Sequence, residues 1–146
     1  MILKCDGIQN PKSPLKVYTE ESFKIYLSDI GLLRKLAKIS IKEILSNKNM
    51  IYKGVLAENY VAQILHAKTR ELYYWQLGST YEVDFLINIE GDIIPVEVKA
   101  SDNVTSKSLN YYINRYKPKY SIRISTKNFG FENNIKSIPL YSAHLL

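Results

Sequence analysis

Apolar and polar residues alternate over short runs in most of this 146-residue chain, which is the pattern of half-buried β-strands. Such runs predict strands at residues 15–18, 23–27, 72–76, 82–89, 93–99, 120–125 and 138–141. Apolar residues at helical spacing predict helices at residues 31–36, 41–45, 53–67 and 105–116, the first of them capped by Asp29. Three successive strands followed by a helix and a further strand are typical of a mixed sheet with helices on its faces. We therefore expect an α/β fold.

The order of these elements indicates three parts. Residues 1–14 contain two prolines and lack periodicity, so they are predicted to be an extended lead-in. Residues 15–53 are predicted to form a small basic appendage made of a strand hairpin and short helices. Residues 54–146 are predicted to form the core, with the long helix at its start.

Charged residues interrupt the two apolar strands that follow the long helix. Glu97 and Lys99 are two positions apart on one strand, so they share a face while valines occupy the other. Asp84 lies on the preceding strand, and helical periodicity turns Glu58 towards the apolar side of the long helix, with Asn59 on its polar side. Charged side chains are rarely placed among apolar residues unless they are paired or bind a metal. The group is therefore either a metal site or an ion-paired cluster that closes the end of the sheet.

Motifs throughout the chain occur in the same order as in a known family. They are Phe23-Lys24-Ile25-Tyr26-Leu27-Ser28-Asp29-Ile30-Gly31-Leu32-Leu33, Gly54-Val55-Leu56-Ala57-Glu58-Asn59, Tyr73-Tyr74-Trp75, Glu82-Val83-Asp84-Phe85, Ile94-Pro95-Val96-Glu97-Val98-Lys99 and Ser106-Lys107-Ser108-Leu109. Together they resemble the DUF4143 domain, and the helix glutamate followed by the strand aspartate and Glu-Val-Lys resembles the PD-(D/E)XK nuclease superfamily. The resemblance covers residues 15–141 and implies a restriction-endonuclease-like core, with a mixed central sheet flanked by helices.

The superfamily resemblance implies phosphodiester hydrolysis of DNA that depends on Mg²⁺ or Mn²⁺. Asp84 and Glu97 would be the direct metal ligands, and Glu58 would bind a second ion or a metal-bound water. Lys99 would orient the attacking water and favour its deprotonated form. Asp84, Glu97, Lys99 and Glu58 are thus the candidate catalytic residues.

The family resemblance also implies a partner. In the DUF4143 family this domain normally follows an AAA-type ATPase module and a winged helix in one longer polypeptide. The chain contains no Gly-x-x-x-x-Gly-Lys-Ser/Thr phosphate-binding loop, so we expect no ATPase activity from it and interpret it as a detached C-terminal domain. Two other hypotheses are a catalytically inactive module that binds nucleic acid or protein and regulates the ATPase, and a homo-oligomerisation domain.

The charge of the chain is compatible with a nucleic-acid partner, since the net charge is +6 and the isoelectric point is about 9.3. Most of the excess lies in residues 1–53, and a second basic stretch over residues 107–127 contains no acidic residue. Candidate nucleic-acid contacts in this stretch are Lys107, Arg115, Lys117 and Lys119. The tyrosines between them either stack on bases or, as we prefer, pack in the core, where we also expect Trp75.

Cysteine and histidine are too few for several kinds of site. Cys5 is the single cysteine, which excludes an internal disulfide or a cysteine zinc cluster. His66 and His144 are the only histidines, which argues against a histidine-rich metal site or a Ser-His-Asp triad. The sequence shows neither a membrane-spanning apolar run nor the features of a signal peptide, so we expect a cytoplasmic protein.

Overall fold

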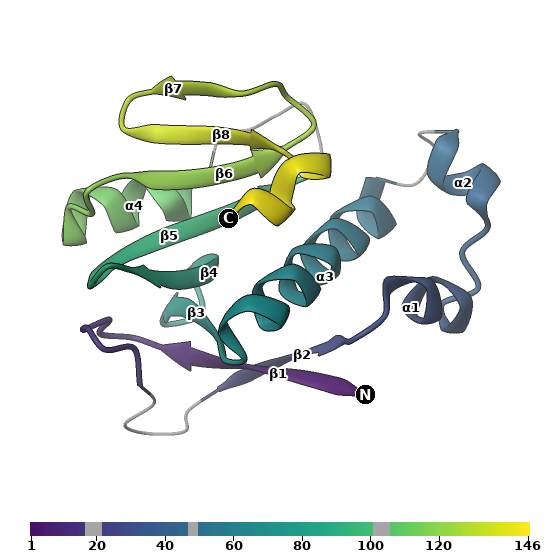
Figure 1. Cartoon of the computed structure of the whole chain (residues 1–146), viewed down its shortest axis with the longest axis horizontal. Coiled ribbons are helices and arrows are strands. Elements are labelled where there is room, and N and C mark those ends of the chain that lie inside the picture. The colour runs from purple at the N-terminus through teal and green to yellow at the C-terminus, as the bar shows by residue number, and fades with distance from the viewer. Residues whose placement is uncertain (17–21, 47–49, 101–105) are drawn as a thin grey trace.

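The chain builds an eight-stranded mixed sheet with helices on both faces, as seen in the computed structural model, which describes residues 1–16, 22–46, 50–100 and 106–146 (Figure 1). The strands are β1 (Ile2–Ile8), β2 (Phe23–Leu27), β3 (Leu72–Leu77), β4 (Tyr81–Ile89), β5 (Asp92–Lys99), β6 (Ser121–Ser125), β7 (Gly130–Glu132) and β8 (Ile135–Pro139). They lie in the order β2-β1-β3-β4-β5-β6-β8-β7. Pairing is parallel for β1 with β3, β5 with β6 and β6 with β8, and antiparallel for the other neighbours. The predicted α/β class with a mixed sheet is confirmed.

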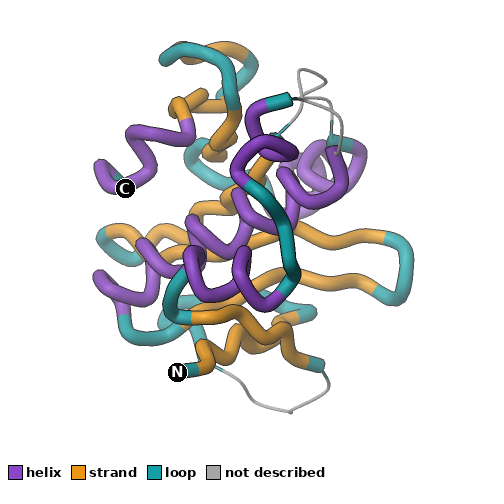
Figure 2. Tube along the Cα trace, turned by 90° about the vertical axis from the view of Figure 1, so that its right-hand side faces the viewer, coloured by secondary structure: helices purple, strands orange, loops and turns teal. Residues whose placement is uncertain are grey.

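The helices follow the predicted order. They are α1 (Ile30–Leu36), α2 (Ile41–Leu45), α3 (Met50–Thr69), α4 (Lys107–Tyr116) and the 3-10 helix η1 (Leu140–Leu145). Figure 2, in which helices are purple and strands orange, shows helices lying over the strands of the sheet. Within the described residues, no helix has the length and apolar character that crossing a membrane requires.

Each face of the sheet has its own core. Val61 of α3 packs with Val96 of β5 on one face, and Leu109 of α4 packs with Trp75 of β3 on the other. Trp75 is fully buried, and the Tyr112 ring meets it edge-on with centroids 5.2 Å apart. This confirms that Trp75 and the tyrosines of α4 are packing residues. Because strand side chains alternate, a residue between two that face α3 points to the α4 side.

The N-terminal residues belong to the sheet, so the prediction of an extended lead-in over residues 1–14 is wrong. Residues 2–8 form β1, which pairs with β2 on one side and with β3 on the other. Leu3 and Cys5 are buried from this strand. The apolar alternation of β1 is short and ends at Asp6 and Gly7, so periodicity alone does not distinguish it from a loop. The predicted strand at 15–18 lies partly outside the described residues, and β2 pairs with β1 instead.

The C-terminal strands also differ from the prediction. The strand expected at residues 138–141 is observed as β8, which is preceded by the short β7 and followed by η1. Asn133 and Asn134 join β7 to β8, and both have positive φ angles, which asparagine tolerates better than most residues. Every residue of β7 is exposed, so this strand has no apolar alternation by which the sequence would reveal it.

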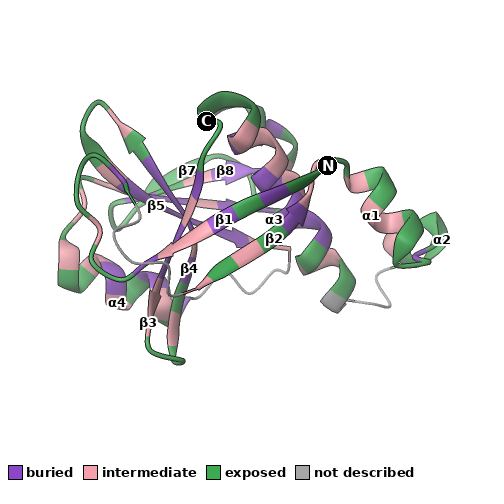
Figure 3. Cartoon of the chain, turned by 90° about the horizontal axis from the view of Figure 1, so that it is seen from below, coloured by how far each residue is buried: buried purple, intermediate pink, exposed green. Residues whose placement is uncertain are grey.

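Helices α1 and α2 project away from the sheet and contain no buried residue (Figure 3). The predicted cap of α1 is present, because the Asp29 side chain accepts a hydrogen bond from the Leu32 N–H at 2.6 Å. The expected N-terminal appendage is therefore limited to these two helices, and β2 is part of the main sheet.

Asn59 of α3 joins strand β2 to the long helix. Its Oδ1 accepts a hydrogen bond from the Leu27 N–H at 2.8 Å, and its Nδ2 donates one to the Leu27 carbonyl at 2.9 Å. The residue is 3% exposed, although helical periodicity placed it on the polar side. The reason is that β2 covers this side of α3, and a buried amide is tolerated because both of its polar atoms are paired.

Replacing Asn59→Ala is expected to lower the free energy of unfolding by about 2–3 kcal/mol, because both hydrogen bonds of a buried side chain are lost and the Leu27 backbone groups lose their partners. Chemical denaturation followed by the fluorescence of Trp75 measures this change. The exposed Asn114→Ala on α4 is the control and is expected to change stability by less than about 0.5 kcal/mol. Equal effects of the two substitutions would contradict the role given to Asn59.

Candidate functional site

Strands β4 and β5 separate near one end of the sheet, and the candidate site lies at this opening. Their backbone pairing stops at Phe85 and Val96, although both strands continue beyond this pair. Asp84 is the next residue of β4 in the opening, and its Oδ2 accepts a hydrogen bond from the Val98 N–H at 2.7 Å. The carboxylate thus takes the place of a strand partner for β5.

A β-bulge on the other side of β4 helps to direct Asp84. The register between β3 and β4 shifts between Tyr73 and Trp75, so that Tyr74 faces both Asp84 and Phe85. Bulges bend a strand and change the direction of its side chains. The bulge therefore occurs at the residue whose side chain turns along the sheet towards β5.

Glu97 and Lys99 lie on the α4 side of β5, because they alternate with Val96 and Val98, which pack in the core under α3. Lys99 Nζ and Glu97 Oε1 form an ion pair at 2.7 Å, with the Glu97 side chain 4% exposed and the Lys99 side chain 30% exposed. Oε2 of Glu97 is buried and has no hydrogen-bond partner within the described part of the chain. A buried carboxylate oxygen without a partner is unfavourable, which points to a ligand at this position.

Lys24 of β2 connects the helix glutamate to β4. Its Nζ lies 3.1 Å from Glu58 Oε1 and 2.5 Å from Glu82 Oε1. The Tyr26 hydroxyl donates a second hydrogen bond to Glu58 Oε1 at 2.5 Å. Glu58 therefore reaches the same end of the sheet as Asp84, but one of its oxygens is already held by two residues of β2.

Electrostatics at the opening disfavour a negative charge on Asp84. Burial raises the pKa of Asp84 well above its usual value, and the charges of Glu97 and Glu58 raise it further. The hydrogen bond from the Val98 N–H and the charge of Lys24 lower this pKa, but they do not cancel the rise. The cluster therefore brings together more negative charge than its own lysines neutralise.

The lysines of the site remain protonated. Burial alone would lower the pKa of Lys99, but its hydrogen bond and ion pair with Glu97, with smaller contributions from Asp84 and Glu58, raise the pKa above its usual value. Lys24 behaves in the same way, because the neighbouring glutamates outweigh the effect of burial on its pKa. Lys99 is thus suited to stabilise negative charge and not to act as a neutral base.

The acidic residues offer a partial set of metal ligands. Among residues 1–16, 22–46, 50–100 and 106–146, no group of three or more His, Cys, Asp or Glu side chains is arranged to hold a metal ion. Asp84 and Glu97 nevertheless fit one, because they are close enough to repel each other and Glu97 has a buried oxygen without a partner. Mg²⁺ commonly binds through one or two carboxylates and retains several waters, so two carboxylates meet its requirements.

The four basic residues expected to contact nucleic acid lie on or near α4 in different environments. Lys107 and Lys117 are exposed. Arg115 lies over the ring of Tyr116 at 5.5 Å from its centroid, and Lys119 pairs with Asp92 at 3.4 Å. Exposed ion pairs of this kind are weak, so all four side chains stay accessible to a ligand.

Sequence reasoning did not assign Lys24 and Tyr26 to the site. The signal was present, because these two residues share one face of a short apolar strand, as Glu97 and Lys99 do. The sequence pattern, however, indicates that β2 belongs to an N-terminal appendage separate from the core. Only the tertiary structure shows that β2 runs past Glu58.

Asp84→Asn is expected to raise the free energy of unfolding by about 1 kcal/mol at about pH 8 without metal. The pKa of Asp84 is higher in the folded protein than in the unfolded chain. At a pH between these two pKa values the folded protein binds more protons than the unfolded chain, so the stability of the wild type falls as the pH rises through this range. The variant lacks this penalty and still accepts the Val98 hydrogen bond.

Thermal melting across a pH series measures this difference, which is expected to shrink as the pH falls and Asp84 becomes protonated. Asp92→Asn, at the opposite end of β5, is the control and is expected to give no such gain. A variant less stable than the wild type at about pH 8 would show that the Asp84 charge is well stabilised in the fold.

Comparison with known proteins gives one match. The family described as a domain of unknown function, DUF4143, matches residues 53–143, which include most of α3, the strands of the opening and α4. No curated protein and no solved structure matches the chain. The match covers more than half of the chain and contains Glu58, Asp84, Glu97 and Lys99. The chain therefore belongs to the DUF4143 family.

Proposed function

We propose that this domain hydrolyses phosphodiester bonds of DNA with a divalent metal ion held at Asp84 and Glu97. The observation that carries the proposal is the buried, unpartnered Oε2 of Glu97 beside a second carboxylate whose pKa is raised. A divalent cation between the two would offset their repulsion and satisfy the free oxygen. The order of Glu58, Asp84, Glu97 and Lys99 along the chain, which resembles the PD-(D/E)XK nucleases, supports the same conclusion.

Each residue has a distinct part in this proposal. Bound Mg²⁺ or Mn²⁺ supplies Lewis-acid stabilisation of the phosphate charge and lowers the pKa of a bound water. Asp84 and Glu97 would hold the ion, and Lys99, which stays protonated, would stabilise negative charge and orient the attacking water. Glu58 is held by Lys24 and would act mainly through its charge.

We infer the partners of the domain from its family and its charge. An AAA-type ATPase module, in the same or a companion polypeptide, would move or remodel the DNA on which this domain acts. With DNA and such an ATPase as partners, we propose that the protein acts in the cytoplasm. The positive net charge supports the choice of DNA as the substrate.

A second candidate function is a catalytically inactive module that binds nucleic acid or protein and regulates the ATPase. It is favoured by the ion pair between Glu97 and Lys99, which neutralises part of the charge without a metal. The absence of a three-ligand group among the described residues favours it as well. Metal binding separates the two candidates, because a closed ion-paired cluster does not take up a cation.

Calorimetric titration with Mn²⁺ tests the proposed metal site directly. We expect wild-type protein to bind the ion and Asp84→Asn or Glu97→Gln to weaken binding at least about tenfold, because each removes one charged ligand. Asp92→Asn is the matched control, since it removes an aspartate carboxylate at the far end of β5, away from Glu97. If the wild type and Asp84→Asn bind Mn²⁺ equally, the ion is held elsewhere.

Cleavage of branched or single-strand-containing DNA in Mg²⁺ or Mn²⁺ tests catalysis. Lys99→Ala and Asp84→Asn are each expected to reduce the rate by at least about a hundredfold, because they remove charge from the site and no packing from the core. Circular dichroism checks the fold. Metal binding without cleavage, also in the presence of the ATPase, would favour the inactive module.

A further inference from the structure

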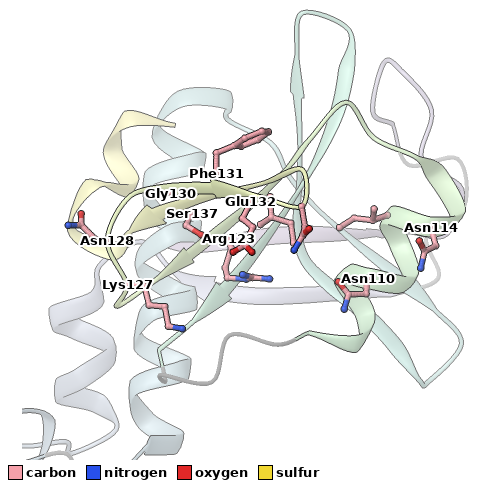
Figure 4. Close-up of a pocket in the computed structure, with 12 residues that line it drawn as sticks. Asn110, Asn114, Arg123, Lys127, Asn128, Gly130, Phe131, Glu132 and Ser137 are labelled. Atoms are coloured by element: carbon pink, nitrogen blue, oxygen red, sulfur yellow. The ribbon is translucent and has the colours of Figure 1, made fainter.

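A hollow of about 900 Å³ lies between α4, β6 and the strands β7 and β8 (Figure 4). Arg123 of β6 is central among the lining residues, with Asn110 and Asn114 of α4 on one side of it and Lys127 on the other. Glu132 is the single acidic residue among those that line this hollow. The hollow therefore carries a positive charge and several amide groups, and it is separate from the carboxylates of the metal site.

Strand register places this hollow next to the candidate metal site. Arg123 pairs with Glu97 on one side and with Ser137 on the other. Residues paired in this way project from the same face of a sheet, and adjacent strands lie about 4.8 Å apart. A ligand in the hollow would therefore lie one strand away from Glu97, on the same side of the sheet.

Arg123 has unused hydrogen-bonding capacity. Its Nε is buried without a hydrogen-bond partner, and no carboxylate in the described part of the chain forms an ion pair with it. A guanidinium group is always protonated and presents a planar set of donors that matches two oxygens of a phosphate. The unmet donor in a positively charged hollow points to an anionic ligand.

The size and lining of the hollow indicate more than a free phosphate. Its volume is in the range of sites for whole organic ligands, and Ile113 and Ile135 give it apolar wall beside the amides of Asn110 and Asn114. Amide side chains can form hydrogen bonds with the edge of a base, and an apolar wall can accept its flat face. In a duplex the bases are stacked and paired, so only an unpaired nucleotide offers both groups to a hollow.

We propose that this hollow binds an unpaired segment of a DNA strand, with Arg123 contacting a phosphate and Lys127 adding charge at its rim. The inference deepens the proposed function, because it identifies the substrate of the same site as DNA with a single-stranded part. It also rests on that function, because the bound DNA strand would lead from the hollow to the carboxylates of Asp84 and Glu97. Binding itself needs neither metal nor cleavage.

The test measures binding of a fluorescent oligothymidine of about 12 nucleotides by anisotropy, in the Asp84→Asn background without divalent ions. Arg123→Gln is expected to weaken binding about tenfold and to lower the slope of log K against log salt by about 0.7, as for one lost phosphate contact on a single strand. Lys127→Gln, at an exposed position, is expected to weaken binding about threefold and guards against misfolding of the first variant.

Lys136→Gln is the matched control. Lys136 lies next to Ser137 on β8 but on the opposite face, where its Nζ sits over the Tyr120 ring at 4.6 Å. Lys136→Gln removes one positive charge, as Arg123→Gln does, so the two variants change the long-range electrostatic field almost equally. Lys136→Gln leaves the hollow unchanged. Equal weakening by Arg123→Gln and Lys136→Gln, or duplex binding as tight as single-strand binding, would overturn the inference. If Arg123→Gln loses binding and the wild type shows no detectable cleavage, the hollow binds single-stranded DNA but the nuclease proposal is refuted.

Discussion

The separation of β4 and β5 beyond Phe85 and Val96 is the constraint on which the candidate site depends. Where two strands part, backbone groups lose their partners, and each such group must be satisfied in another way. Asp84 meets this need by accepting the Val98 N–H, and it is thereby held at the mouth of the opening. Next to the opening, the buried Oε2 of Glu97 also has no hydrogen-bond partner within the described part of the chain. The break in the sheet thus positions Asp84 beside Glu97 of β5.

Two lysines from different parts of the chain compensate for this gathering of acids. Lys99 holds Glu97 from within β5, and Lys24 holds Glu58 and Glu82 from β2. The pKa of Asp84 nevertheless stays raised, first because the group is buried and then because of the charges of Glu97 and Glu58. Strand β2 is therefore not an accessory, since it supplies a charge without which the acids of α3 and β4 would repel one another more strongly.

One side of helix α4 packs in the core, and another side lines the hollow. Tyr112 and Tyr116 surround the buried Trp75, and the Trp75 Nε1 donates a hydrogen bond to the Gln9 carbonyl at 3.0 Å. Asn110 and Asn114 project from the same helix into the hollow. The aromatic packing holds the helix rigidly against the sheet. A wall supported in this way keeps the distance between its amide groups and Arg123 constant, as a binding site requires.

The sequence by itself determined the α/β class, the mixed sheet, the position of most helices and strands, and the shared face of Glu97 and Lys99. These features are local, because they follow from side-chain periods within single elements. The tertiary structure alone decided that residues 2–8 complete the sheet, that Asn59 is buried, and that Lys24 reaches Glu58. It also brought Arg123 beside Glu97. Such pairings depend on which distant strands are neighbours, and the energy that selects the neighbours comes from burial of whole faces and not from the pattern of any one segment.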